Sequence, residues 1–224
     1  MSHCRTDSSS RGLAFPPVVV VLVIAFSLPI ALTDHLPMQD IPNHLAIVRT
    51  LAAEDSDPEW DTRFENRLTP DAYSTYYFAC TVLAKHVGAE AANRIVLTLY
   101  AAFMPLAFLA LVMAYAPDRR WNTIPAFLLI YSDLYLVGFT NYLLALPMLL
   151  AGTAAGLRIA RSDTIDCASV LALAVLGAAL YFTHPFVLAM LLVVLAILVP
   201  SRGLVGRRLR LLGHYARPRF YLAP

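Results

Sequence analysis

A chain of 224 residues in which 59% are hydrophobic and only 14% are charged is too apolar to be a soluble domain. The net charge of +2 is small, and its distribution gives no sign of a nucleic-acid partner. Cys4, Cys80 and Cys167 stand in separate segments without metal-ligand spacing, which argues against a disulfide framework or a zinc site.

The N-terminal segment predicts a membrane anchor. Residues 1–12 are polar and include two arginines, and an apolar run follows at 13–32. A bilayer core of about 30 Å needs a helix of about 20 residues, which this run supplies. Because residues 30–32 lack a small-residue cleavage pattern, we expect an uncleaved signal anchor rather than a removed signal peptide.

Residues 33–91 are interpreted as one large outer loop. Apolar residues recur at helical spacing at 45–52 and again at 73–87, so two amphipathic helices are predicted there. The tyrosines of the second helix suit a membrane–water boundary, where a ring can face lipid and a hydroxyl can face water. An acidic connector at 54–71 joins the two helices, and Gly88 is expected to end the second one.

The remaining apolar stretches predict further spans. One runs from about Ala92 to Tyr115. Residues 121–157 would form a single helix of about 55 Å, far longer than a bilayer is thick, so two short spans with a turn at 138–141 are expected. The run at 167–200 is interrupted at 183–185, where a second turn is expected because proline disfavours helix in the residue before it.

The charge distribution orients these spans. Most of the arginines fall in segments that a six-span order places on one side, and most of the acids fall in the outer loop. Six spans with both termini cytoplasmic therefore satisfy the positive-inside rule. The domains expected are a cytoplasmic N-terminus at 1–12, a transmembrane domain at 13–200 and a basic cytoplasmic tail at 201–224. The fold class expected is an all-α integral membrane protein of about six transmembrane helices, in a cell membrane of bacterial type.

Residues 34–44 carry the densest polar chemistry of the chain. Asp34, His35, Asp40 and His44 lie within this segment, directly after the first apolar run. Asp40 has a structural explanation, since aspartate is a favoured N-cap and the proline two residues later suits a first turn. It also has a functional one, because Asp40 and His44 are four residues apart and can share a helix face around one phosphate, hydroxyl or metal ion.

Three later polar residues are candidates for the same site. Asp133 lies about 18 Å along its span, at a depth where an ionisable side chain usually faces a cavity or a partner. The alternative explanation is structural: Asp133 stands near a helix end, and its side chain reaches the membrane surface. Asn141 and His184 stand in the two predicted turns on the outer side, where His184 is either a structural turn residue or part of the pocket.

These motifs resemble the GT-C class of membrane glycosyltransferases, which use polyprenyl-phosphate-linked sugars. The resemblance is to the N-terminal part of such enzymes and covers most of the chain to about residue 200. It is carried by three runs of sequence: Asp40-Ile41-Pro42-Asn43-His44-Leu45 after the first span, Gly138-Phe139-Thr140-Asn141-Tyr142, and Thr183-His184-Pro185. In that class an acidic residue of the first outer loop is catalytic, and Asp40 is the matching position.

The resemblance implies a one-step transfer. Asp40 would accept the proton of an attacking acceptor hydroxyl while the lipid phosphate leaves the anomeric carbon, which inverts that carbon. The departing phosphate needs cations or hydrogen-bond donors, which Arg49, Arg94 or His44 could supply. Whether a divalent metal ion assists is left open, because Asp34 and His35 could join Asp40 and His44 as hard ligands.

A transporter or a non-catalytic membrane partner is the alternative function. An intramembrane Asp133 and broken helices would also suit a substrate pathway. Against this alternative, the second half of the chain does not repeat the first, and the polar chemistry gathers on one face. Members of the resembled class usually carry more spans and often a further outer domain, so a truncated member is one expectation. The partners expected are membrane lipid and a polyprenyl-phosphate sugar donor.

Overall fold

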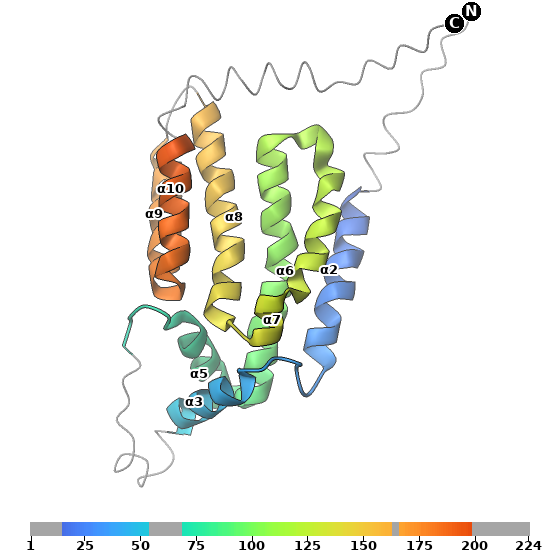
Figure 1. Ribbon diagram of the computed structural model, residues 1–224, viewed down its shortest axis with the longest axis vertical. Helices are drawn as coiled ribbons and strands as arrows, with labels where there is room; N and C mark the ends of the chain where they lie inside the picture. Colours follow the sequence, from blue (N-terminus) through green and yellow to red (C-terminus); the bar gives the residue numbers. More distant parts are fainter. Residues whose placement is uncertain (1–14, 54–68, 163–165, 199–224) are drawn as a thin grey trace, which may run out of the picture.

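The computed structural model describes residues 15–53, 69–162 and 166–198, and in these ranges the protein is helical and contains no β-strand (Figure 1). The expected termini at 1–12 and 201–224 and most of the acidic connector lie outside these ranges. In chain order the elements are α2 (Phe15–Leu32), α3 (Ile41–Ala53), α5 (Thr75–Val87), α6 (Ala89–Tyr115), η1 (Pro117–Tyr131), α7 (Asp133–Val137), α8 (Thr140–Arg161), α9 (Cys167–Thr183) and α10 (Pro185–Leu198).

The elements form a bundle with a short helical layer at one end. Helices α2, α6, α8, α9 and α10 and the 3₁₀ helix η1 run along the long axis, whereas α3 and α5 lie across one end (Figure 1). Helix α6 is central, because it packs against α2, η1, α5 and α8. The all-helical fold class is therefore confirmed for the described residues.

Three described helices are long and apolar enough to cross a membrane, namely α2 with 18 residues, α6 with 27 and α8 with 22. Many of their apolar side chains face outward, as a surface in contact with lipid requires. Helices also occupy the other three expected spans, but η1, α9 and α10 have 15, 17 and 14 residues. The described residues thus include three helices of spanning length and apolar composition, which is typical of a membrane protein.

Both predicted interruptions are confirmed. Gly138 adopts a left-handed conformation with φ of 97° and ends α7. His184 separates α9 from α10, with its own N–H bonded to the carbonyl of Leu180 at 2.7 Å. The predicted start of the second span at Ala92 is three residues late. Gly88, with φ of 83°, ends α5 and also accepts the Ala92 N–H at 3.0 Å, so α6 begins directly after this glycine.

A close approach of α8 to α10 depends on glycine. A Cβ added at Gly152 would lie 2.8 Å from the Leu191 side chain, which is less than any ordinary van der Waals contact. Leu191 is buried with Leu180 of α9 and Val187 of α10 in one apolar cluster. This packing holds the hairpin of α9 and α10 against α8 and thereby fixes the position of the turn at His184.

Helices α3 and α5 are held to α6 by a separate apolar cluster. Val48, Tyr76 and Cys80 are fully buried there, together with small residues of α6. The Tyr76 hydroxyl donates to Oδ1 of the buried Asn93 at 2.8 Å, so the one polar group of this ring is paired. Burial raises the pKa of the Cys80 thiol to about 12. The end layer is therefore a packed part of the fold and can support a site.

Candidate functional site at the end of the bundle

The backbone around Asp40 is fastened to the end of α7. The Gln39 N–H donates to the carbonyl of Leu136 at 2.8 Å, and the Asp40 N–H donates to that of Val137 at 3.0 Å. A Cβ added at Gly138 would lie 3.1 Å from both Cβ and backbone N of Asp40. Glycine is therefore needed at residue 138 both for its left-handed φ and for the approach of the two backbones.

Asp40 lines a pocket of about 250 Å³. The residues around this Asp40 pocket come from the start of α3, the start of α5, the turn before α8 and the turn before α10: Asp40, His44, Tyr73, Phe139, Thr140, Asn141, Tyr142 and His184. Within the described residues, no hydrogen bond or ion pair engages the Asp40 carboxylate. Four of the seven predicted site residues, Asp40, His44, Asn141 and His184, meet here.

His44 is engaged through both of its ring nitrogens. Its Nε2 lies 3.1 Å from the carbonyl oxygen of Gly138, which can only accept, so Nε2 carries a proton. Its Nδ1 lies 2.8 Å from the Tyr77 hydroxyl. Burial, and after it the negative charge of Asp40, raises the pKa of Tyr77, so this hydroxyl keeps its proton and can either donate to Nδ1 or accept from it. Both ring nitrogens are thus occupied, and His44 joins α3, α5 and the Gly138 turn.

Asn141 is also occupied by structural bonds. Its Oδ1 accepts from the backbone N–H of Tyr76 at 3.1 Å, and its Nδ2 donates to the carbonyl of Tyr73 at 2.9 Å. The first bond satisfies one of the unpaired N–H groups at the start of α5. The second holds the bend at Tyr73, a non-glycine residue with φ of 64°. Asn141 therefore shapes the wall of the pocket and keeps Tyr73 in place.

His184 stands among aromatic rings. Tyr73 and Tyr142 meet it edge to face, with ring centroids at 4.8 Å and 5.1 Å. Its Nδ1 is buried and has no hydrogen-bond partner among the described residues. Burial lowers the pKa of His184, so the ring is neutral at physiological pH. This side chain is thus an uncharged member of the aromatic wall.

The start of α5 is tied to the end of α9, which closes the pocket on that side. The Ser74 N–H donates to the carbonyl of Phe182 at 2.9 Å. The hydroxyls of Thr75 and Thr183 lie 2.9 Å apart, and the Thr183 hydroxyl reaches the carbonyl of Ala179 at 2.7 Å. The bonds from Ser74 to Phe182 and between Thr75 and Thr183 join segments that are more than a hundred residues apart in sequence.

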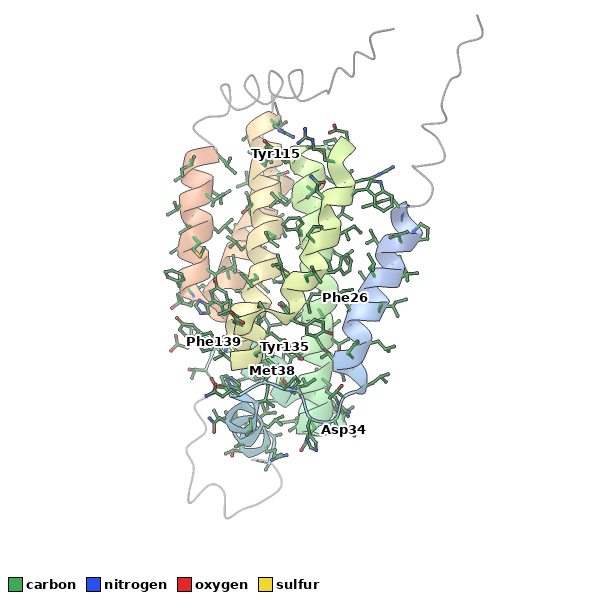
Figure 2. The ribbon with its side chains drawn as sticks, turned by 45° about the vertical axis from the view of Figure 1, so that its right-hand side comes forward. Phe26, Asp34, Met38, Tyr115, Tyr135 and Phe139 are labelled. Carbon is green, nitrogen blue, oxygen red and sulfur yellow. The ribbon has the colours of Figure 1, made fainter. Side chains whose placement is uncertain are left out.

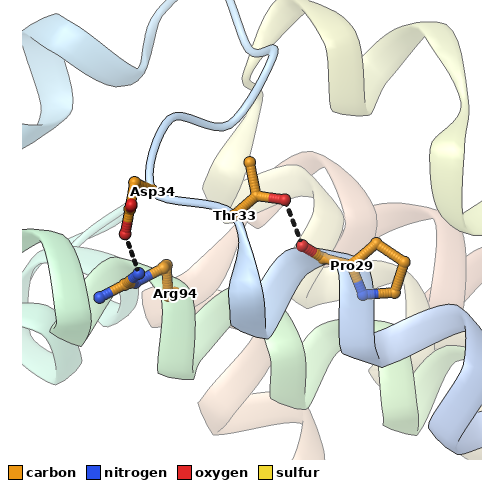
Figure 3. Close-up of polar contacts among 4 residues, drawn as sticks. All are labelled: Pro29, Thr33, Asp34 and Arg94. Carbon is orange, nitrogen blue, oxygen red and sulfur yellow. Dashed lines mark hydrogen bonds and ion pairs between the residues drawn. The ribbon is translucent and has the colours of Figure 1, made fainter.

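The two arginines predicted to receive a phosphate are already paired. Arg94 donates to Oδ1 of Asp34 at 2.8 Å (Figure 3), and Arg49 donates to Oε1 of Glu90. Asp34 follows the C-terminal end of α2, where the Thr33 hydroxyl donates to the carbonyl of Pro29 at 2.6 Å (Figure 3). Both ion pairs are partly exposed to solvent, so each stabilises the fold only slightly and is open to exchange.

Arg49 lines a second pocket of about 270 Å³, which mixes polar and apolar side chains: Asp34, His35, Leu36, Met38, Ile41, Pro42, Leu45, Arg49, Glu90 and Asn93. The two pockets lie on different faces of α3. His44 lines the first pocket, whereas Leu45 and Arg49 line the second, and neighbouring residues of a helix point about 100° apart. Figure 2 shows Phe139 of the first pocket and Asp34 of the second on opposite sides of this end of the bundle.

The possible metal-ligand set is divided between the two pockets. Asp34 and His35 line the second pocket, whereas Asp40 and His44 line the first. In the ranges that the structure describes, no three His, Cys, Asp or Glu side chains lie close enough together to hold a metal ion. The described residues therefore supply no preformed metal site.

Asp133 lies apart from these residues. It is the first residue of α7, it is exposed, and it lines neither pocket. An acid in the first turn of a helix is stabilised by the helix dipole. The structure therefore favours the helix-end explanation of Asp133 over a role in the site.

Sequence reasoning missed the aromatic part of the Asp40 pocket. Tyr73 was expected only as a boundary tyrosine, and Phe139 and Tyr142 were noted only as parts of a motif. The sequence did indicate Phe139 and Tyr142 by position, since both stand within two residues of Asn141 at a predicted turn. Nothing local in the sequence shows that Tyr73 reaches this turn, because the contact arises from packing of α5 on α8 and α9.

The chain matches no family model, no curated protein sequence and no solved structure. Fold and site by themselves define a class: a helical protein of membrane type with an acidic, aromatic-walled pocket at one end of its bundle.

Proposed function

We propose that this protein is a membrane glycosyltransferase of the GT-C type, which transfers a sugar from a polyprenyl-phosphate donor at the outer face of the membrane. The observation that carries the proposal is the Asp40 carboxylate. It lines a pocket of about 250 Å³ at the end of membrane-length helices, and no described residue pairs with it. An unpaired carboxylate beside a pocket is available to take a proton from a bound hydroxyl.

The proposed reaction is a single displacement. The oxygen of the acceptor hydroxyl bonds to the anomeric carbon as the carbon–oxygen bond to the lipid phosphate breaks, and that bonding pair leaves with the phosphate. The hydroxyl proton passes to Asp40. The configuration at the anomeric carbon inverts, because the nucleophile enters opposite the leaving group. A carboxylate fixed by its own backbone bonds to α7 is well placed for such a transfer.

The other predicted site residues take revised roles. His44 and Asn141 hold the pocket in shape through bonds that already use their polar atoms, so they are positioning residues. Arg49 and Arg94 would contact the donor phosphate after exchanging their present carboxylate partners for it. Such an exchange costs little, since exposed ion pairs contribute only about 0–1 kcal/mol.

The proposal includes six spans with both termini cytoplasmic. A 3₁₀ helix rises by about 2.0 Å per residue, so the part of η1 after the kink at Arg119, residues 120–131, extends over about 24 Å, most of the roughly 30 Å thickness of a bilayer core. Helices α9 and α10 run beside α8 and return the chain to the side from which α9 starts (Figure 1). Under this topology the Asp40 pocket faces the outer side.

A charge-removing, shape-conserving substitution tests the enzyme. In membranes supplied with lipid-linked sugar, Asp40→Asn is expected to lower the transfer rate at least about 100-fold, as loss of a general base does. Asp118→Asn is the matched control, because Asp118 is exposed at the start of η1, at the other end of the bundle. Unchanged transfer by Asp40→Asn would remove the enzyme proposal. Uptake of a substrate that depends on Asp133 would support the transporter instead.

A further inference from the structure

The Asp40 pocket combines one negative charge with aromatic walls, and these features together suit a small organic cation. We propose that this pocket binds a ligand that carries an ammonium group. The inference goes beyond sugar transfer, since it concerns equilibrium binding and needs no donor. Where both hold, the ammonium group belongs to the acceptor and the donor phosphate lies outside this pocket.

The charge of the pocket is unbalanced. Among the described residues that line the pocket, Asp40 alone carries a carboxylate, and none is a lysine or an arginine. Neither histidine is bonded to this carboxylate, because Tyr77 and the Gly138 carbonyl occupy both ring nitrogens of His44 and burial keeps His184 uncharged. A phosphate placed here would meet a carboxylate without a counter-charge, whereas an ammonium group would supply the missing one.

Arg49 and Arg94, the two described arginines expected at this site, do not compensate Asp40 either. Arg49 is paired with Glu90, and Arg94 is paired with Asp34, and these residues belong to the second pocket or its rim. Among the described residues, the charges of the second pocket and its rim are therefore balanced, whereas the Asp40 pocket is negative. A bound cation is the ligand that balances the Asp40 pocket.

The aromatic rings add a second, independent attraction for a cation. Tyr73, Phe139 and Tyr142 line the pocket, and the faces of such rings attract ammonium groups. Tyr73 and Tyr142 are held by their edge-to-face contacts with His184, and the Tyr73 backbone is held by Asn141. The rings are thus ordered before a ligand arrives, so binding spends little conformational entropy on them.

The test compares two ligands of the same shape and different charge. The full chain in lipid nanodiscs is titrated calorimetrically with choline and with 3,3-dimethylbutan-1-ol, in which carbon replaces the charged nitrogen. Choline is expected to bind at least about tenfold more tightly than the neutral alcohol. Asp40→Asn is expected to weaken choline binding at least about tenfold, whereas Asp118→Asn leaves it unchanged. Tyr142→Leu, which keeps an apolar side chain but removes the ring, is expected to weaken it several-fold.

Each outcome decides the inference. Equal affinities for the two ligands, no binding of choline, or an equal loss in Asp40→Asn and Asp118→Asn would overturn it. Thermal melting of each variant shows whether a loss of affinity comes from unfolding. If Asp40→Asn is unfolded, the choline affinity of Tyr142→Leu still tests the inference. Transfer that depends on Asp40 without selective choline binding would overturn the cation inference alone. Selective choline binding with transfer unaffected by Asp40→Asn would overturn the glycosyltransferase proposal alone.

Discussion

Gly138→Ala tests whether the site depends on the contact between the Gly138 turn and Asp40. The glycine is buried, its φ is 97°, and an added Cβ would lie 3.1 Å from both Cβ and backbone N of Asp40. Asp40 cannot yield freely, since its N–H is bonded to the carbonyl of Val137 at 3.0 Å. The new methyl group must therefore push the Asp40 backbone away from α7 by a few tenths of an ångström.

The expected cost has two parts. A left-handed conformation costs an alanine about 1–2 kcal/mol relative to glycine. Weakening of the hydrogen bond from Asp40 to α7 adds about 0.5–1.5 kcal/mol. The sum of about 1.5–3.5 kcal/mol lowers the melting temperature by about 3–14 °C for a chain of this size. Because the displacement acts on the proposed base itself, transfer and choline binding should both fall about tenfold or more in protein that is still folded.

Gly88→Ala is the matched control. Gly88 also has positive φ, at 83°, but nothing lies within 4 Å of its added Cβ. Its ψ of 160° places it in a region that is nearly restricted to glycine, so alanine there costs about 1–3 kcal/mol of backbone strain. Gly88→Ala should lower the melting temperature and leave choline affinity unchanged. If Gly138→Ala kept full affinity, or if both variants lost it equally, the contact with Asp40 would not be what shapes the site.

Three further outcomes are expected. Asn141→Ala removes two hydrogen bonds to the backbone and should destabilise the protein by about 2–3 kcal/mol, seen as a lower melting temperature. Asn43 is exposed, so Asn43→Ala should change the stability by under about 0.5 kcal/mol. Equal effects of the two substitutions would contradict the capping role of Asn141. In folded protein at pH 8, maleimide should modify the exposed Cys167 and spare Cys80, whose pKa burial raises to about 12, and rapid loss of both thiols would refute this burial. Burial lowers the pKa of His184 below its usual 6.5. The stability that the neutral, buried ring contributes is therefore complete above pH 6.5 and is lost as the pH falls. Melting temperatures should drop toward about pH 5, and His184→Gln should flatten this pH dependence.

The choice of helix and the places where helices stop could be predicted from the sequence, because both depend on neighbouring residues. Long apolar runs fix helices in a bilayer, and glycine at 138 and proline at 185 act on the backbone within a residue or two. The error at the start of α6 has the same local origin. Gly88 was expected to end α5, but one glycine both ends α5 and begins α6.

The lining of the Asp40 pocket was predicted in part, and the bonds made by its members were not predicted. Asp40, His44, Asn141 and His184 do gather in one pocket, because turns at one end of a bundle meet there. Which polar atoms remain free could not be predicted, since the partners of His44 and Asn141 come from distant helices. A side chain has few donors and acceptors, and packing decides which neighbours use them.

The sequence by itself determined that this is a helical protein of membrane type, where its helices break, and that a carboxylate follows the first of them. Only the tertiary structure decided that, within the described ranges, this carboxylate has no partner whereas Arg49 and Arg94 each have one. The physical reason is that helix formation and proline or glycine breaks act over a few residues, whereas the charge balance of a pocket is set by side chains that folding brings together from all along the chain.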